Sequence, residues 1–158
     1  MTQFQKISLV LLRLTLGWMF LYAGITKLIN PAWTAAGYLS GAKTFPELYA
    51  FFMRPDILPV IDFLNMWGLT LIGAALILGI FVRLASVAGL LLMILYYLPI
   101  LQFPHPNPNS YIVDQHIIFM AAFLILAAFR AGRVWGLEKT CVALPICSRF
   151  PRLRALLG

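Results

Sequence analysis

The stretch ILPVIDFLNMWGLTLIGAALILGIFV, residues 57–82, decides the fold class, because Asp62 is its only ionisable residue. A helix rises about 1.5 Å per residue, so about 20 apolar residues cross the hydrocarbon core of a bilayer. Three further apolar runs with few charges occupy residues 7–29, 84–103 and 111–129. The sequence therefore predicts an all-α membrane protein, an antiparallel bundle of four transmembrane helices.

Composition agrees with this class and leaves no room for a second, soluble domain. Of 158 residues, 62% are hydrophobic and 11% are charged, whereas a soluble domain carries about 25% charged residues. We expect a transmembrane domain over residues 1–139 and a basic cytoplasmic tail over residues 140–158. The net charge of +7 gathers after the last apolar run, so we expect membrane lipid, not nucleic acid, as its partner.

The same basic residues predict the orientation of the chain. Arg83 lies in the short turn between the second and third runs. By the positive-inside rule, Arg83 and both termini face the cytoplasm, and we expect a prokaryotic inner membrane. The connection at residues 30–56 then lies outside, and it predicts two short interfacial helices. Asn30-Pro31 would begin the first, and a capping box from Thr44 to Glu47 would begin the second.

Several polar side chains are expected to reach one level just beneath the outer membrane surface, because ionisable groups within a membrane face a partner or a cavity. Tyr96 could border this level. The candidates for a pocket come from separate segments of the chain and are Lys27, Asp62, Asn65, Trp67, Asp114 and His116.

In the hypothesis that these residues form a site, Asp62, Asp114 and His116 are catalytic. His116 would relay protons, since its charge changes near neutral pH. Lys27 would form an ion pair with Asp62 or Asp114. A quinone headgroup suits such a pocket, because its carbonyl oxygens need hydrogen-bond donors and its reduction needs protons.

The other members of the set, Lys27, Asn65 and Trp67, would bind the substrate. Two structural alternatives remain open. The charges could form an interfacial salt bridge that fixes helix register, and Asp114 could be an N-terminal acid favoured by the helix dipole.

Other features predict structure more than chemistry. Arg13 is expected to extend its side chain to the inner headgroups, because the inner halves of the runs offer no acid. Gly17 and Gly24 lie on one face of the first run, and small residues such as Gly73 permit close helix contacts in lipid. The histidines match no haem motif, so neither haem nor a metal is predicted.

Short motifs occur in a consistent order along the chain. They are RLTLG at 13–17, YAGITK at 22–27, NPAW at 30–33, WG at 67–68, LIGAALILG at 71–79 and RLA at 83–85. In this order and spacing the chain resembles the DoxX/DoxD family of small four-span membrane proteins. VDQH at 113–116 and AGRVWGL at 131–137 resemble the DoxD branch. Related sequences often carry an acid beside the glycine of the second span, where this chain has Leu69.

The resemblance implies a membrane subunit linked to the respiratory quinone pool. In the DoxD branch the implied activity is a thiosulfate:quinone oxidoreductase, which oxidises thiosulfate to tetrathionate. Quinone is then the expected cofactor. Other membrane subunits of an oxidoreductase complex are the expected partners, because the chain has no dinucleotide loop, cysteine cluster or haem motif.

Two further functions compete with this reading. A non-catalytic accessory subunit of a larger respiratory or electron-transfer complex is the main alternative. A small transporter is a third possibility, although the sequence predicts no broken central helix. A cavity among Lys27, Asp62 and Asp114 that opens to lipid would favour quinone binding, and the lack of one would favour the accessory role.

Overall fold

The structure is a computed structural model that describes residues 1–138, so the predicted tail at 140–158 lies outside the described residues. The described chain is helical and contains no strand longer than isolated bridges, which confirms the all-α class. Its elements are α1 (Gln3–Leu28), α2 (Ala36–Ser40), α3 (Pro46–Phe52), α4 (Leu58–Leu78), α5 (Val82–Ile100), α6 (Gln115–Ala128) and the 3-10 turn η1 (Ala131–Arg133).

Three of these helices, α1, α4 and α5, are long and apolar enough to cross a membrane. The fourth run forms a shorter helix, because α6 has 14 residues and so extends about 21 Å, against about 30 Å of hydrocarbon. It begins at Gln115 because the Asp114 carboxylate accepts hydrogen bonds from the backbone N–H groups of His116 and Ile117. Three helices able to cross a membrane are therefore confirmed, and four complete spans stay a prediction.

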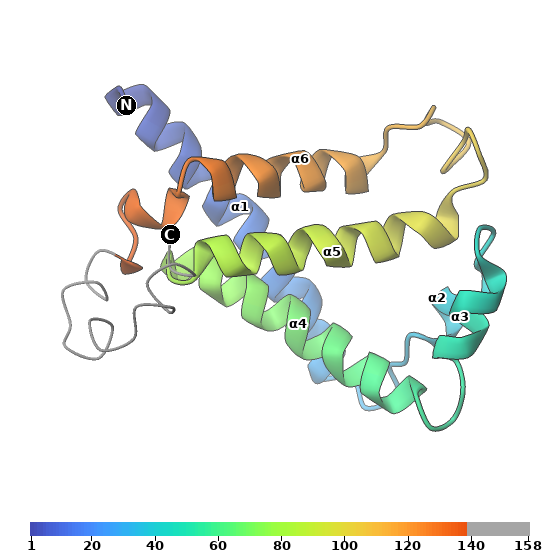
Figure 1. The fold of residues 1–158 in the computed structure, drawn as a ribbon. Coiled ribbons are helices and arrows are strands. Elements are labelled where there is room, and N and C mark those ends of the chain that lie inside the picture. The colour runs from blue at the N-terminus through green and yellow to red at the C-terminus, as the bar shows by residue number, and fades with distance from the viewer. Residues whose placement is uncertain (139–158) are drawn as a thin grey trace.

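The helices form two pairs that diverge from one end of the molecule. Helix α1 packs along α4, and α5 packs along α6. The pairs meet where α4 turns into α5, which we call the closed end, and separate toward the opposite, open end, where α2 and α3 lie (Figure 1). The turn at the closed end is short because Gly79 ends α4 in the left-handed conformation, with φ of +67°.

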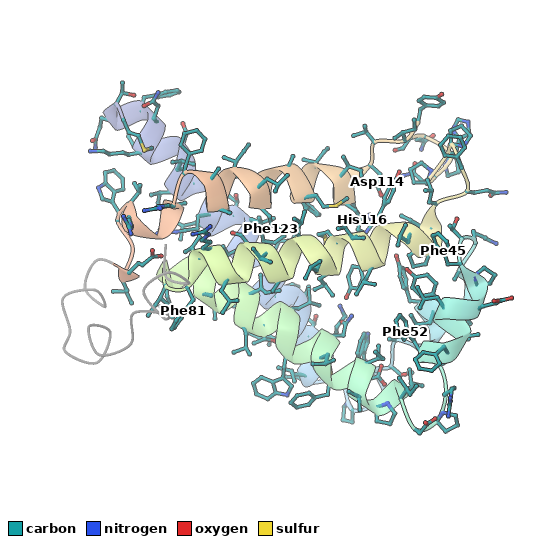
Figure 2. All side chains as sticks on the ribbon, in the orientation of Figure 1. Phe45, Phe52, Phe81, Asp114, His116 and Phe123 are labelled. Atoms are coloured by element: carbon teal, nitrogen blue, oxygen red, sulfur yellow. The ribbon has the colours of Figure 1, made fainter. Side chains whose placement is uncertain are left out.

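Close backbone contact joins α1 to α4, as the glycines predicted. A methyl group added at Gly73 would lie 2.2 Å from the backbone nitrogen of Leu21, and one added at Gly24 would lie 2.3 Å from Thr70 Oγ1. In the other pair, Gly89 of α5 receives the fully buried ring of Phe123 from α6 (Figure 2). Small residues thus set the spacing within both helix pairs.

Substituting Gly73 with alanine should destabilise the protein, because the added methyl group must push α1 and α4 apart. Overpacking of this kind costs about 1–3 kcal/mol. Gly68→Ala on the same helix is the matched control, since its methyl group would meet no atom within 4 Å. Thermal midpoints of the detergent-solubilised proteins should fall for Gly73→Ala alone. Equal midpoints for the two variants would contradict the assigned α1–α4 contact.

Arg13 does not extend to the headgroups, and that prediction was wrong. Its side chain is buried at the closed end, where Nη1 donates hydrogen bonds to the carbonyl oxygens of Ala131 at 2.7 Å and Val134 at 3.0 Å. The chain after α6 turns back at Arg130, which has a positive φ of 48°. The residues after α6 therefore surround the Arg13 guanidinium with their backbone carbonyl groups. These carbonyl groups accept the hydrogen bonds that water would otherwise accept.

The acid that the sequence analysis did not find near Arg13 is Glu138. Its side chain is 1% exposed, and its charge acts on Arg13. Burial raises the pKa of Glu138 to about 7, so the carboxyl group is only partly ionised at neutral pH. The carbonyl oxygens therefore remain hydrogen-bond acceptors for Arg13 whether or not Glu138 is ionised.

The connection between α1 and α4 forms two short helices, as predicted, but they begin differently. The first begins at Ala36, several residues after Asn30-Pro31. The second begins after Phe45 with no side-chain cap, because Thr44 donates its hydroxyl to the carbonyl of Leu101 instead of forming the expected capping box. These contacts anchor the connection to the end of α5, and we call residues 30–56 the cap.

Candidate functional site

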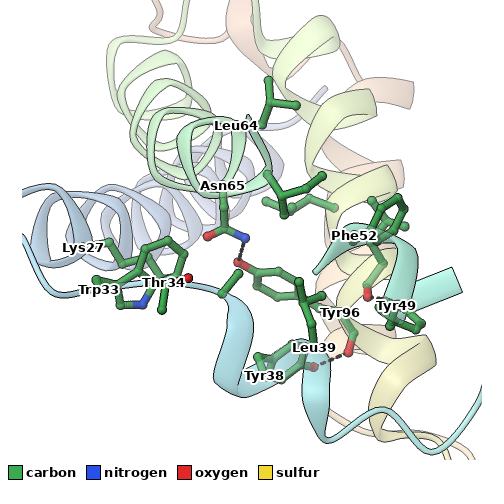
Figure 3. A pocket seen from close by; sticks show the side chains of 14 residues that line it. Lys27, Trp33, Thr34, Tyr38, Leu39, Tyr49, Phe52, Leu64, Asn65 and Tyr96 are labelled. Atoms are coloured by element: carbon green, nitrogen blue, oxygen red, sulfur yellow. Dashed lines mark hydrogen bonds between the residues drawn. The ribbon is translucent and has the colours of Figure 1, made fainter. Parts of the chain in front are cut away.

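A cavity of about 430 Å³ lies between α4 and α5 at the open end, beneath the cap (Figure 3). Most of its wall is apolar. The cap contributes Leu39 and Phe52, and α5 contributes Leu92 and Leu95. The cap is held over the cavity by a hydrogen bond of 3.1 Å from the Tyr49 hydroxyl to the carbonyl of Leu95. Divergence of the helix pairs therefore creates a space that aromatic and aliphatic side chains surround.

A hydrogen bond between Asn65 and Tyr96 crosses the wall of this cavity. Asn65 Nδ2 donates to the Tyr96 hydroxyl at 2.6 Å, and so joins α4 to α5. The Asn65 side chain lines the cavity and the residue is 8% exposed, yet its Oδ1 atom has no hydrogen-bond partner within residues 1–138. A buried acceptor without a donor costs about 1–3 kcal/mol, and the described side chains do not offset this cost.

Lys27 brings a positive charge to the same cavity. Its Nζ atom lies 5.1 Å from the centroid of the Trp33 ring and 5.9 Å from that of Tyr96, within the range of cation–π attraction. The predicted ion pair of Lys27 with Asp62 or Asp114 was wrong, because no such pair occurs in the described part of the chain. The two carboxylates instead accept hydrogen bonds from backbone N–H groups.

Asp62 stabilises the cap. Its Oδ1 atom accepts a hydrogen bond of 2.8 Å from the backbone N–H of Ala35, the residue before α2. A carboxylate at this position satisfies an N–H group that the helix itself cannot pair. Asp62 thus fixes α2 against α4.

Asp114 and His116 border a second space, of about 620 Å³, on the other side of α5. His116 Nδ1 lies 2.6 Å from Asp114 Oδ2, and Figure 2 shows both at the start of α6. Tyr38 and Tyr96 line this space and the first cavity alike, so they divide the two. The Tyr38 hydroxyl donates to the carbonyl of Tyr96, which holds the partition together.

The structure therefore separates the residues that the sequence placed in one pocket. Lys27 and Asn65 line the first cavity, whereas Asp114 and His116 line the second. Trp67 lines neither: it is 42% exposed and packs on Phe63. Two residues beyond Asn65, it lies about 200° around the helix, on the opposite face.

Sequence reasoning missed the part that cap aromatics play in the cavity. Trp33, Tyr38 and Tyr49 belong to the connection that was predicted only to form interfacial helices, yet all three line the space beneath the cap. Their number was the available signal, because a surface helix does not need so many rings. Tyr96 was expected only to border the polar level, and it proves to be shared by both spaces.

The comparison with protein families agrees with this architecture. The DoxX family matches residues 8–100, from the first helix to the end of α5. The protein belongs to the DoxX family. No curated protein and no solved structure matches the chain. Membership of the DoxX family and its three apolar helices together make this chain an integral membrane protein.

The two roles of Asp114 in this DoxX protein can be separated by substitution. Asp114→Ala should lower stability by about 1 kcal/mol, because α6 loses its N-cap. Asp114→Asn should change stability by only a few tenths of a kcal/mol, since asparagine caps equally well, but it removes the negative charge beside His116. Thermal midpoints measure the change in stability, and the NMR chemical shifts of the His116 ring report the change in its contact with residue 114. Equal loss of stability in both variants would contradict the capping role.

Proposed function

We propose that this DoxX-family protein is the membrane subunit of a quinone-linked oxidoreductase and that the cavity beneath the cap receives the quinone headgroup. The observation that carries the proposal is the convergence of Lys27, Asn65 and Tyr96 on an otherwise apolar cavity of about 430 Å³. Small-molecule sites typically combine an apolar wall with a few polar groups that fix orientation. A ring ligand that arrives from the bilayer needs both features.

The residues of the cavity fit a quinone. Lys27 and the Tyr96 hydroxyl can donate hydrogen bonds to carbonyl oxygens, and Trp33, Tyr38 and Phe52 offer aromatic surface to the ring. The position fits as well, since α4 and α5 are membrane-crossing candidates and the cavity lies between their ends.

Each polar residue has a distinct task in this proposal. When bound, a quinone supplies an acceptor for two electrons and two protons. The Lys27 ammonium would stabilise negative charge on a ligand oxygen, an effect that is strong where water is excluded. The Asp114–His116 pair would relay a proton behind the Tyr38–Tyr96 partition. Asp62 would serve only to position the cap.

The resemblance to the DoxD branch indicates which compound could donate the electrons. We propose thiosulfate, whose oxidation to tetrathionate releases the electrons, and a partner subunit that delivers them. The VDQH and AGRVWGL segments that carry this resemblance lie outside the matched residues 8–100. We also propose a prokaryotic inner membrane with cytoplasmic termini, in which α6 completes a fourth span. The cavity then lies near the outer surface.

One observation favours a non-catalytic accessory subunit as the second candidate. Both carboxylates that the sequence placed in catalysis, Asp62 and Asp114, pair with backbone N–H groups at helix starts. Their positions are therefore explained by structure alone. In that case the cavity would bind a lipid or quinone only as a stabilising group.

The proposal is tested by quinone binding to the purified protein in lipid nanodiscs. Tyr96→Phe and Lys27→Met should each weaken binding about 10-fold or more, because each removes a hydrogen-bond donor to a quinone oxygen. Phe63→Leu is the matched control, since Phe63 lies on α4 with 56% exposure and outside the cavity.

A result with no saturable binding, or with equal affinity in all three variants, would contradict a quinone site in this cavity. The role in catalysis needs a second assay, thiosulfate-dependent quinone reduction by the complex that co-purifies from the native membrane. If Lys27→Met leaves that activity unchanged, the accessory role replaces the catalytic one.

A further inference from the structure

Pro99 creates a hydrogen-bond acceptor in the wall of the cavity. A residue inside a helix donates its backbone N–H to the carbonyl four residues earlier, but proline has no N–H group. Because Pro99 lies inside α5, the carbonyl of Leu95 lacks its helical donor. The Tyr49 hydroxyl of the cap supplies a donor at 3.1 Å, and Tyr49 is fully buried. The cap thus pairs a carbonyl that α5 itself leaves unpaired.

The end of α5 offers further carbonyl groups to the cap, because the last four carbonyls of a helix have no partner within it. The backbone N–H of Lys43 donates to the carbonyl of Pro99 at 2.7 Å. Thr44 donates its hydroxyl to the carbonyl of Leu101, just beyond the helix. The cap is therefore attached to α5 through hydrogen bonds to backbone carbonyl groups.

The cap has a small apolar cluster of its own. The buried residues Ala35, Leu39 and Tyr49 form this cluster, which is separate from the core between the long helices. Helices α2 and α3 have five and seven residues, fewer than the about 12–15 that an isolated helix needs to persist in water. Elements held in this way open locally at a lower free energy than the long helices do.

Half of the residues that line the cavity belong to the cap. The opposite wall is less free to move, because the Asn65–Tyr96 hydrogen bond joins α4 to α5. We infer that the cap is the gate through which a ligand enters and leaves the cavity, and that the Tyr49–Leu95 hydrogen bond is the latch that keeps this gate closed. The inference rests on the proposed function for the ligand, a quinone, and adds the route and the rate of its exchange.

Removing the Tyr49 hydroxyl should open the cap more often. Loss of one hydrogen bond changes an equilibrium about fivefold, so Tyr49→Phe should speed amide hydrogen exchange in residues 36–52 by about that factor. Mass spectrometry of the protein in nanodiscs measures this exchange, and peptides from α4 should be unchanged. Tyr22→Phe is the matched control, since it removes a hydroxyl from an exposed position on α1, far from the cap in sequence.

Pro99→Ala tests the origin of the acceptor. This substitution restores a backbone N–H that can donate to the carbonyl of Leu95, so the Tyr49 hydroxyl is no longer its sole donor. In the Pro99→Ala background the effect of Tyr49→Phe should shrink to about twofold or less. An equal effect in both backgrounds would overturn the role assigned to Pro99.

The exchange of decylubiquinone tests the gate. Its association and dissociation rates can be followed in nanodiscs by stopped-flow quenching of tryptophan fluorescence, because Trp33 lines the cavity. Tyr49→Phe should raise both rates about fivefold and leave the dissociation constant nearly unchanged, since the hydroxyl binds a backbone carbonyl and not the ligand. Unchanged rates would overturn the gate.

The two measurements separate this inference from the proposed function. Hydrogen exchange needs no ligand, and two of its outcomes overturn the latch: cap amides of the unmodified protein that exchange as slowly as those of α4, or no effect of Tyr49→Phe. If decylubiquinone does not bind saturably, the proposed function fails and the gate fails with it. Saturable binding with unchanged rates in Tyr49→Phe overturns the gate alone.

Discussion

The fold depends first on the buried guanidinium of Arg13. An isolated charge within a membrane protein is costly, so the chain must bring it partners. The segment after α6 does this by turning back and presenting the carbonyl groups of Ala131 and Val134. These hydrogen bonds tie the first helix to the last at the closed end, where Gly79 and Gly136 leave room for the guanidinium. The two helix pairs thus pack directly at this end, whereas at the open end they are joined through the Asn65–Tyr96 hydrogen bond and the cap.

Divergence at the other end follows from that constraint and creates the site. Space opens between α4 and α5, and the cap fills its mouth through contacts of Tyr49 and Asp62 with the helices. The one direct polar contact between α4 and α5 in this region, within residues 1–138, is the Asn65–Tyr96 hydrogen bond. The chemistry proposed for the cavity therefore comes from residues that also set its width.

The length and apolar character of the runs predicted the helices well, because each run must pair its own backbone groups in lipid. The start of α6 could not be placed so easily, since the run continues through Ile112 and Val113 while Asp114 caps the helix. The site was predicted in part. The position of each polar residue along its helix was readable from sequence, but its direction around the helix and the path of the cap were not. Asp114 and Lys27 therefore proved to lie on different sides of Tyr96, and Arg13 found partners in a distant turn.

The most direct test of the account is photoaffinity labelling of the protein in nanodiscs with an azidoquinone, followed by peptide mass spectrometry. A quinone site in this cavity predicts saturable labelling of cavity residues such as Trp33, Leu92 and Tyr96, and unlabelled quinone should compete with the label. Labelling confined to lipid-facing residues such as Leu71, with no competition by unlabelled quinone, would contradict it.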